Sequence, residues 1–177
     1  IQRGHGHAFF GELTNVPLVM KPQGGLDSDV HVDVLTSHVD LLASLLELLG
    51  IENSSIPRSG RYSVAPWLDP GRDTAEIPRR GSTLLGATRY GPPQRGIRTK
   101  TMRLTEFPDG EYPVELFDLE QDPRELRDLA LVEDPRLPEL LDLLSSTWSQ
   151  LEPYRGTRVP VELDKESLDR LEALGYL

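Results

Sequence analysis

The chain has 177 residues, of which 37% are hydrophobic and 27% charged, with 15 prolines and 15 glycines. That length suffices for one domain with a small appendage, and the absence of cysteine excludes disulfides, thiolate metal sites and a thiol nucleophile within it. A net charge of -10 argues against nucleic acid and anionic membranes as partners, and no apolar run approaches the roughly 20 residues that a membrane span needs.

Two histidines stand in the first informative stretch, in the order Gly4-His5-Gly6-His7, ahead of an aromatic pair and Glu12. Glycines on both sides of His5 leave room for a ligand to approach its imidazole. A histidine in a loop just before a buried strand can serve as a ligand, a hydrogen-bond donor or an acid. It can equally be a solvated loop residue, and the two histidines alone do not decide between these roles.

Two short strands are expected next. The apolar residues 16–20 predict a strand buried on both faces of a sheet, with Pro17 near its start, where no ladder donor is lost. Residues 30–35 alternate apolar and polar side chains, which predicts a half-buried strand with His31 on its polar side. We therefore expect a surface role for His31.

A leucine-rich helix is predicted from Ser37. Ser37 and Asp40 form a capping box, and Gly50 is suited to the position just after the helix end. Apolar residues cover most of the helix circumference, so the pattern predicts deep packing against a sheet. Asp40 is interpreted as a cap rather than a catalyst.

The second half predicts an antiparallel sheet. Residues 82–90 and 96–105 are expected to be strands, Pro108-Asp109-Gly110 a turn, and residues 112–119 the closing strand. The aspartate-proline pair at 122–123 predicts the start of a helix, and so does the pair at 134–135. The second helix carries a stripe of leucines that should dock on the sheet.

Two further groups of residues complete the pattern. Asp164 should cap a last short helix. The acidic residues between 115 and 122 could suggest a metal site, but they are interpreted as a strand end and a turn.

These motifs together resemble the sulfatases of the alkaline-phosphatase-like superfamily. The first stretch is similar to that family's "L-Y-x-E…V-P-L-I" segment, which a lysine or histidine precedes, and residues 37–51 are similar to its "S-x-V-D-L-x-P-T-L-L-x-L-x-G-I" helix. The most specific likeness is residues 115–130, which follow "E-L-Y-D-L-x-x-D-P-x-E-x-x-N-L-A" in near register. The resemblance runs through nearly all 177 residues in the family's order, but it covers the C-terminal portion of the family's chain.

The resemblance implies an α/β fold. Residues 1–80 would be the tail of a parallel-sheet catalytic domain, and residues 81–177 a small α+β subdomain with an antiparallel sheet and a packed helix. His5 would contact the sulfate group as the catalytic residue, with His7 beside it as a second substrate-binding residue. The family's formylglycine nucleophile and calcium-type divalent ion would be held by residues outside this segment, so no metal ligand is expected within it.

The expected activity is therefore hydrolysis of a sulfate ester by the full-length protein, with this segment inactive alone and dependent on a missing N-terminal portion or a partner chain. Two alternatives stay open. One is a phosphomonoester, phosphodiester or phosphonate hydrolase, or a transferase, of the same superfamily, and the other is a non-catalytic interaction module.

Overall fold

The structure is a computed structural model. It describes residues 6–22, 24–25, 29–51, 62–69, 71–75, 77–86, 91–151 and 163–173. The helices and strands assigned there, in chain order, are α1 (Gly11–Thr14), α2 (His38–Leu48), the 3-10 helix η2 (Ala65–Leu68), β1 (Ser82–Gly86), β2 (Arg95–Thr99), β3 (Met102–Glu106), β4 (Glu115–Asp118), the 3-10 helix η3 (Ala130–Val132), α3 (Leu137–Ser149) and α4 (Lys165–Ala173). No helix in these ranges is both long and apolar enough to span a bilayer.

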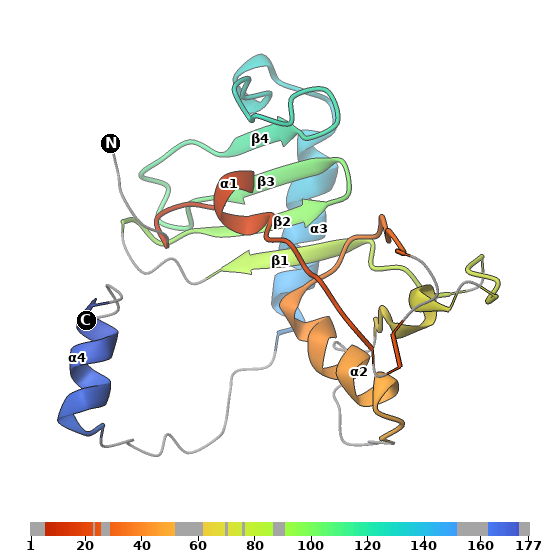
Figure 1. The fold of residues 1–177 in the computed structure, drawn as a ribbon. Coiled ribbons are helices and arrows are strands. Elements are labelled where there is room, and N and C mark those ends of the chain that lie inside the picture. Colours follow the sequence, from red (N-terminus) through yellow and green to blue (C-terminus); the bar gives the residue numbers. More distant parts are fainter. Residues whose placement is uncertain are drawn as a thin grey trace.

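A four-stranded antiparallel meander, in the order β1-β2-β3-β4, organises the fold (Figure 1). Helix α3 crosses one face of this sheet and the short helix α1 lies on the other. The predicted antiparallel sheet with a packed helix is thus confirmed. Successive side chains of a strand alternate between the two faces, so the pairing register decides which residues meet each helix.

The hydrophobic core lies between the sheet and α3. Ile97, Leu104 and Leu116 are aligned across three neighbouring strands and have no exposed surface. Leu144 of α3 is also fully buried in this cluster, and Leu140 is nearly so. The leucine stripe predicted for this helix therefore packs on the sheet as expected.

The predicted strand 96–105 is instead a hairpin, formed by β2 and β3. The chain reverses at Lys100-Thr101, where the Thr99 hydroxyl accepts hydrogen bonds from the amides of Thr101 and Met102 at 3.3 and 2.9 Å. A threonine hydroxyl bonded to nearby amides favours such a turn over a continuous strand. The next predicted turn is confirmed, because the Gly110 amide donates to the Phe107 carbonyl at 2.9 Å and Gly110 has φ 68°.

The two strands predicted before α2 are not formed. Residues 16–20 and 30–35 have no ladder partner among the described residues, and the Val19 side chain is 90% exposed. An apolar run becomes a strand when a neighbouring strand supplies its hydrogen bonds. His31 is exposed, in agreement with the surface role expected for it.

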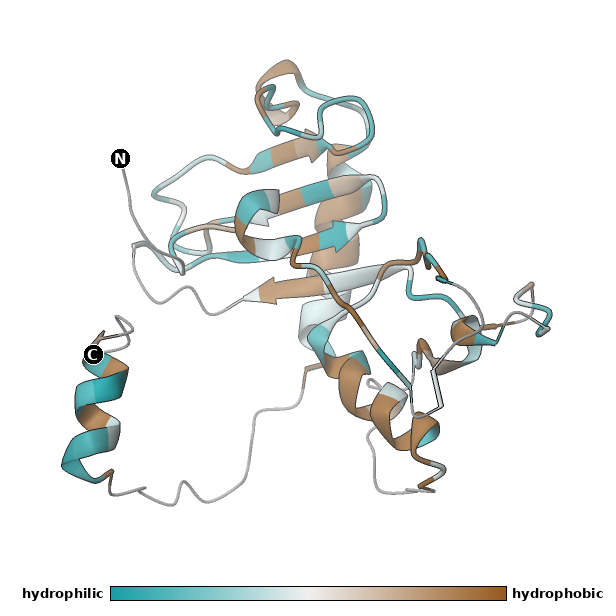
Figure 2. Ribbon diagram, viewed as in Figure 1, coloured by the Kyte–Doolittle hydropathy of each residue, from teal (hydrophilic) through white to brown (hydrophobic). Residues whose placement is uncertain are grey.

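Helix α2 begins and ends as predicted. Ser37 and Asp40 form the capping box, and Gly50 follows the helix with φ 66°. The expected deep packing is absent in the described residues, where the buried positions of α2 are Asp40 and Ser44. Much of α2 is hydrophobic (Figure 2), and three of its leucines border an open groove of about 310 Å³. The lining of this groove is Leu18, Val19, Met20, Lys21, Leu41, Leu45 and Leu48.

Of the two aspartate-proline pairs predicted to start helices, the second precedes one and the first does not. No helix follows Pro123, because both amides that Asp122 binds, those of Leu126 and Arg127 at 2.7 Å, close a turn. Helix α3 starts at Leu137, two residues after Pro135. Near the C-terminus, Asp164 accepts a hydrogen bond from the Ser167 amide at 2.8 Å, which confirms it as the cap of α4.

Candidate functional site

The candidate site starts at Gly6 and His7, the first residues that the structure describes. Gly6 has φ 88°, a left-handed conformation that favours glycine at this position. His7 is half-buried, and its carbonyl oxygen accepts a hydrogen bond from Gln94 Nε2 at 2.9 Å. His5 lies outside the described residues, so its predicted contact with a sulfate group stays a prediction.

Helix α1 begins at Gly11, four residues after His7. Its Thr14 hydroxyl donates to the carbonyls of Phe9 and Phe10, both at 3.2 Å, and the Asn15 amide donates to the Gly11 carbonyl at 2.8 Å. Four residues are too few for a helix to be stable alone. The segment 7–14, which we call the histidine segment, must therefore be held by the sheet beneath it.

Two phenylalanines attach the histidine segment to the sheet. Phe9 is buried against Gly96, where an added Cβ would meet its ring at 3.2 Å. The Phe10 ring stands edge-on to the Phe117 ring, with centroids 6.0 Å apart. Between these rings lies the guanidinium of Arg103, whose central carbon is 4.6 Å from both centroids. Cation–π contact of this kind is strongest when the cation is desolvated.

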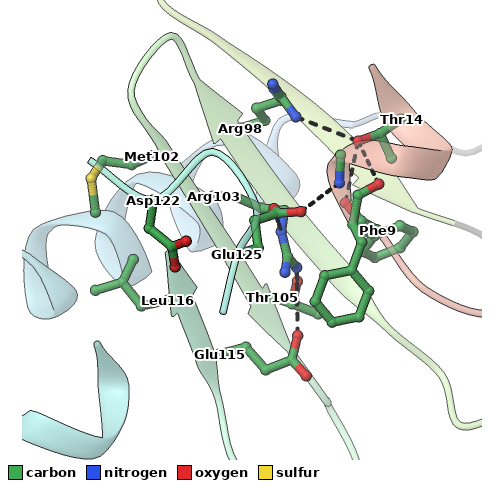
Figure 3. A network of polar contacts seen from close by, with 12 residues as sticks. Phe9, Thr14, Arg98, Met102, Arg103, Thr105, Glu115, Leu116, Asp122 and Glu125 are labelled. Atoms are coloured by element: carbon green, nitrogen blue, oxygen red, sulfur yellow. Dashed lines mark hydrogen bonds and ion pairs between the residues drawn. The ribbon is translucent and has the colours of Figure 1, made fainter. Parts of the chain in front are cut away.

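Arg103 is fully buried on this face and forms a polar network (Figure 3). Its Nε donates to Glu125 Oε1 at 2.5 Å, and its Nη1 donates to the Thr105 hydroxyl at 2.6 Å and reaches Glu115 Oε2 at 3.5 Å. The second oxygen of Glu125 accepts a hydrogen bond from the Gly11 amide at 2.5 Å. One carboxylate thus joins the sheet to the first residue of α1.

Charge and burial act together in this network. Burial raises the pKa of Glu115, and the nearby Arg103 opposes that rise. Burial lowers the pKa of Arg98, while the carboxylate of Glu125 acts in the other direction. Arg98 and Arg103 are direct cross-strand neighbours, an arrangement of like charges that is destabilising unless a carboxylate lies close. Glu125 supplies that carboxylate.

Asp118, the last residue of β4, serves the local structure, as the interpretation of a strand end predicts. Asp118 pairs with Arg136 at 2.8 Å and accepts the amides of Glu120 and Gln121, both at 3.1 Å. These contacts, led by the bond from Arg136, lower the pKa of Asp118. Among the described residues, no three histidine or acidic side chains are grouped as a metal ion requires.

Two residues of the network were not singled out from the sequence. Arg103 lies on the strand face opposite α3, which an alternating pattern assigns to solvent. Glu125 lies in a polar run after Asp122-Pro123, and nothing local marks it as buried. The fourth residue of the family pattern "D-P-x-E" does fall on Glu125, and this was the one signal that could have identified it.

Comparison with known proteins gives a likeness in fold. No protein-family model and no curated protein matches the chain. Similar solved structures include BT4656 in complex with its substrate D-glucosamine-2-N,6-O-disulfate, with 25% identity and a TM-score of 0.49 over 63% of this chain and 23% of that one. BT1596, a 2-O GAG sulfatase, has 25% identity and a TM-score of 0.46 over 62% and 23%. BT33336S-sulf of Bacteroides thetaiotaomicron has 20% identity and a TM-score of 0.49 over 66% and 26%.

The solved structures that resemble the chain are sulfatases, the family that its sequence motifs resemble. The chain spans about a quarter of the length of these structures. With TM-scores below 0.5, the matches add no weight to a particular activity.

Proposed function

We propose that this chain is the C-terminal part of a sulfate-ester hydrolase, in which the turn at His5 and His7 contacts the sulfate group. The observation that carries the proposal is the attachment of the histidine segment. Residues 9–12, which match the family's "L-Y-x-E", lie on the antiparallel sheet, and Gln94 and Glu125 hold the His7 carbonyl and the Gly11 amide. A histidine segment fixed in this way is suited to a positioned chemical role.

The proposed role of His5 follows from the charge that develops during hydrolysis. As the S–O bond of a sulfate ester breaks, negative charge accumulates on the leaving oxygen. An imidazole that donates a hydrogen bond or a proton to that oxygen lowers the barrier. His7, two residues away, would contribute to substrate binding.

A divalent ion and a formylglycine would supply electrostatic stabilisation and the nucleophile, as the family resemblance implies. In the described part of this segment, no donor set fits such an ion, because the carboxylates of Asp118 and Asp122 are used by backbone amides and Arg136. We therefore assign both groups to residues outside the segment.

The test uses the full-length protein and two substrates, 4-nitrophenyl sulfate and 4-nitrophenyl phosphate. His5→Ala should lower kcat on the sulfate roughly a hundredfold or more, as loss of a positioned acid or oxyanion donor does. His7→Ala should cost much less, and His31→Ala, on an exposed position, is the matched control and should leave kcat unchanged. Wild-type kcat in His5→Ala would contradict the assignment, and hydrolysis of the phosphate alone would favour a phosphate-ester hydrolase of the same superfamily.

The open groove beside α2 supports the part of the proposal that makes this chain one portion of a larger protein. Its leucines and the exposed Val19 are apolar surface that would be covered by the rest of a catalytic domain or by a partner chain. We accordingly expect the isolated 177-residue chain to be inactive and prone to aggregate. A monomeric chain that melts cooperatively in solution would contradict this part of the proposal.

A further inference from the structure

The two oxygens of the Glu125 carboxylate bind two different parts of the molecule. Oxygen Oε1 accepts the hydrogen bond from Arg103 on β3, and Oε2 accepts the one from the Gly11 amide in the histidine segment, each at 2.5 Å. The side chains of Glu125 and Arg103 are 3% and 0% exposed. Hydrogen bonds to an ionised carboxylate are short and strong, so this bridge sets the distance between the sheet and Gly11 closely.

The backbone at Glu125 is itself in an uncommon conformation. Its φ is 53°, in the left-handed region that residues other than glycine seldom adopt. The turn that holds it is closed by Asp122, whose carboxylate binds the amides of Leu126 and Arg127 at 2.7 Å. Such a strained residue persists when its surroundings over-determine it, and it often marks a functional position. Here the strain directs a carboxylate under the histidine segment.

If the Arg103–Glu125 pair only held two parts of the fold together, it would contribute little net stability. Desolvation of a buried ion pair offsets much of its attraction, and well-packed apolar side chains often stabilise a site as well or better. In addition, no described residue accepts a hydrogen bond from Arg103 Nη2, although this atom is buried. Compared with apolar packing, a carboxylate that accepts two hydrogen bonds fixes the distance and orientation between the two groups that it binds. Such fixed geometry matters most where a reaction depends on the placement of a side chain.

We propose that Glu125 is a positioning residue for the reaction, acting with Arg103 to fix the histidine segment at its height above the sheet. The bridge holds Gly11, four residues from His7, while Gln94 holds the His7 carbonyl at the other end of the segment. This inference rests on the proposed function. It adds that Arg103 on β3 and Glu125 in the turn after β4 set the efficiency of the histidine segment.

The experiment compares Glu125→Gln with Glu115→Gln in the full-length protein. Both variants remove one negative charge from the surroundings of Arg103, but Glu115 has no hydrogen bond to the histidine segment among the described contacts. With 4-nitrophenyl sulfate, Glu125→Gln should lower kcat roughly 10- to 100-fold with KM changed less than about threefold, because misplacement by about 1 Å can cost about a hundredfold. Glu115→Gln should keep kcat within about twofold.

A second arm separates positioning from stability. If Glu125 acts through the histidines, its effect should largely disappear when His5 is already removed, so Glu125→Gln added to His5→Ala should lower kcat by less than about threefold. Should Glu125→Gln fail to fold, Glu125→Asp retains the charge beside Arg103 while shortening the bridge by one carbon. It should show the same loss in kcat. Equal losses in the Glu125 and Glu115 variants, or losses of His5 and Glu125 that multiply in full, would overturn the proposal.

A third measurement does not depend on activity. The Gly11 amide should exchange with solvent slowly in the wild-type protein, roughly tenfold or more faster in Glu125→Gln, and at the wild-type rate in Glu115→Gln. If the protein hydrolyses neither ester, the proposed function fails, and this exchange measurement still tests the bridge. Unchanged Gly11 exchange in Glu125→Gln would refute the bridge itself.

Discussion

Replacement of Gly96 by alanine tests the packing between β2, β3 and the histidine segment. A Cβ built on Gly96 would lie 2.7 Å from the Leu104 carbonyl oxygen and 3.2 Å from the Phe9 ring. The first distance is about 0.6 Å shorter than the roughly 3.3 Å at which carbon and a carbonyl oxygen usually meet. The obstructing oxygen belongs to the backbone, so the two strands must move apart locally, and over-packing of this kind costs about 1–3 kcal/mol.

Amide hydrogen exchange of the β2 and β3 peptides in the full-length protein measures this cost as a free energy of opening. Gly96→Ala should lower it by about 1–3 kcal/mol, and the peptide that contains Phe9 should lose protection as well. The matched control is Gly81→Ala, since a Cβ there meets nothing within 4 Å and Gly81 has no left-handed φ. It should stay within about 0.5 kcal/mol of the wild type. A Gly96→Ala protein with wild-type protection in β2 would refute the reasoning.

Three further predictions concern other parts of the molecule. Leu144→Ala should destabilise the protein by about 2–5 kcal/mol in urea unfolding, because Leu144 is fully buried, while Leu126→Ala, at a position 79% exposed, should change it by less than about 0.5 kcal/mol. Ser44→Ala removes the hydroxyl that accepts the Val64 amide at 3.0 Å, so it should cost about 1–3 kcal/mol and release η2 from α2 in proteolysis; an unchanged digestion pattern would argue against this joint. The pKa of Asp118 is lowered in the folded protein, so its contribution to stability is present above its ordinary value of 3.8 and is lost as pH falls through the lowered one. Asp118→Asn should therefore lower the melting temperature at pH 7 but flatten its decline below about pH 4, and an equally steep decline in wild type and variant would contradict the assignment.

The elements predicted most accurately were those with a local physical signal. The capping box at Ser37 and Asp40, the glycine after α2, the turn at Gly110 and the leucine stripe of α3 each depend on neighbours within a few residues. The hairpin between β2 and β3 was missed because Lys100-Thr101 is not one of the strong turn pairs, although four successive polar residues, 98–101, interrupt the alternation there. The short strands at 16–20 and 30–35 failed for the opposite reason, since pairing depends on a distant partner.

The polar network was the least predictable part of the candidate site. The two-residue period of β3 correctly sends Arg103 away from α3, but it cannot show that the histidine segment, about ninety residues earlier, covers that face. Nor does a single sequence reveal a left-handed φ at Glu125. The histidines and the motif at residues 115–130 were recognised by resemblance to a family. The structure adds that the carboxylate of Glu125, within that motif, binds the Gly11 amide of the histidine segment.

Helix α3 and the histidine segment cover opposite faces of the sheet, and the attractions that hold them respond differently to temperature. Helix α3 is held by hydrocarbon contact through Ile97, Leu104 and Leu116, an attraction that weakens on cooling. The histidine segment is held by Phe9 and Phe10 and also by the Arg103–Glu125 pair, and the dehydration penalty of such a pair falls as temperature rises. Cooling should therefore weaken the contacts between α3 and the sheet first. Warming should favour the ion-pair contact between the histidine segment and the sheet. If the proposed role of the histidines is right, the segment that carries them would keep its placement better toward the upper end of the working temperature range.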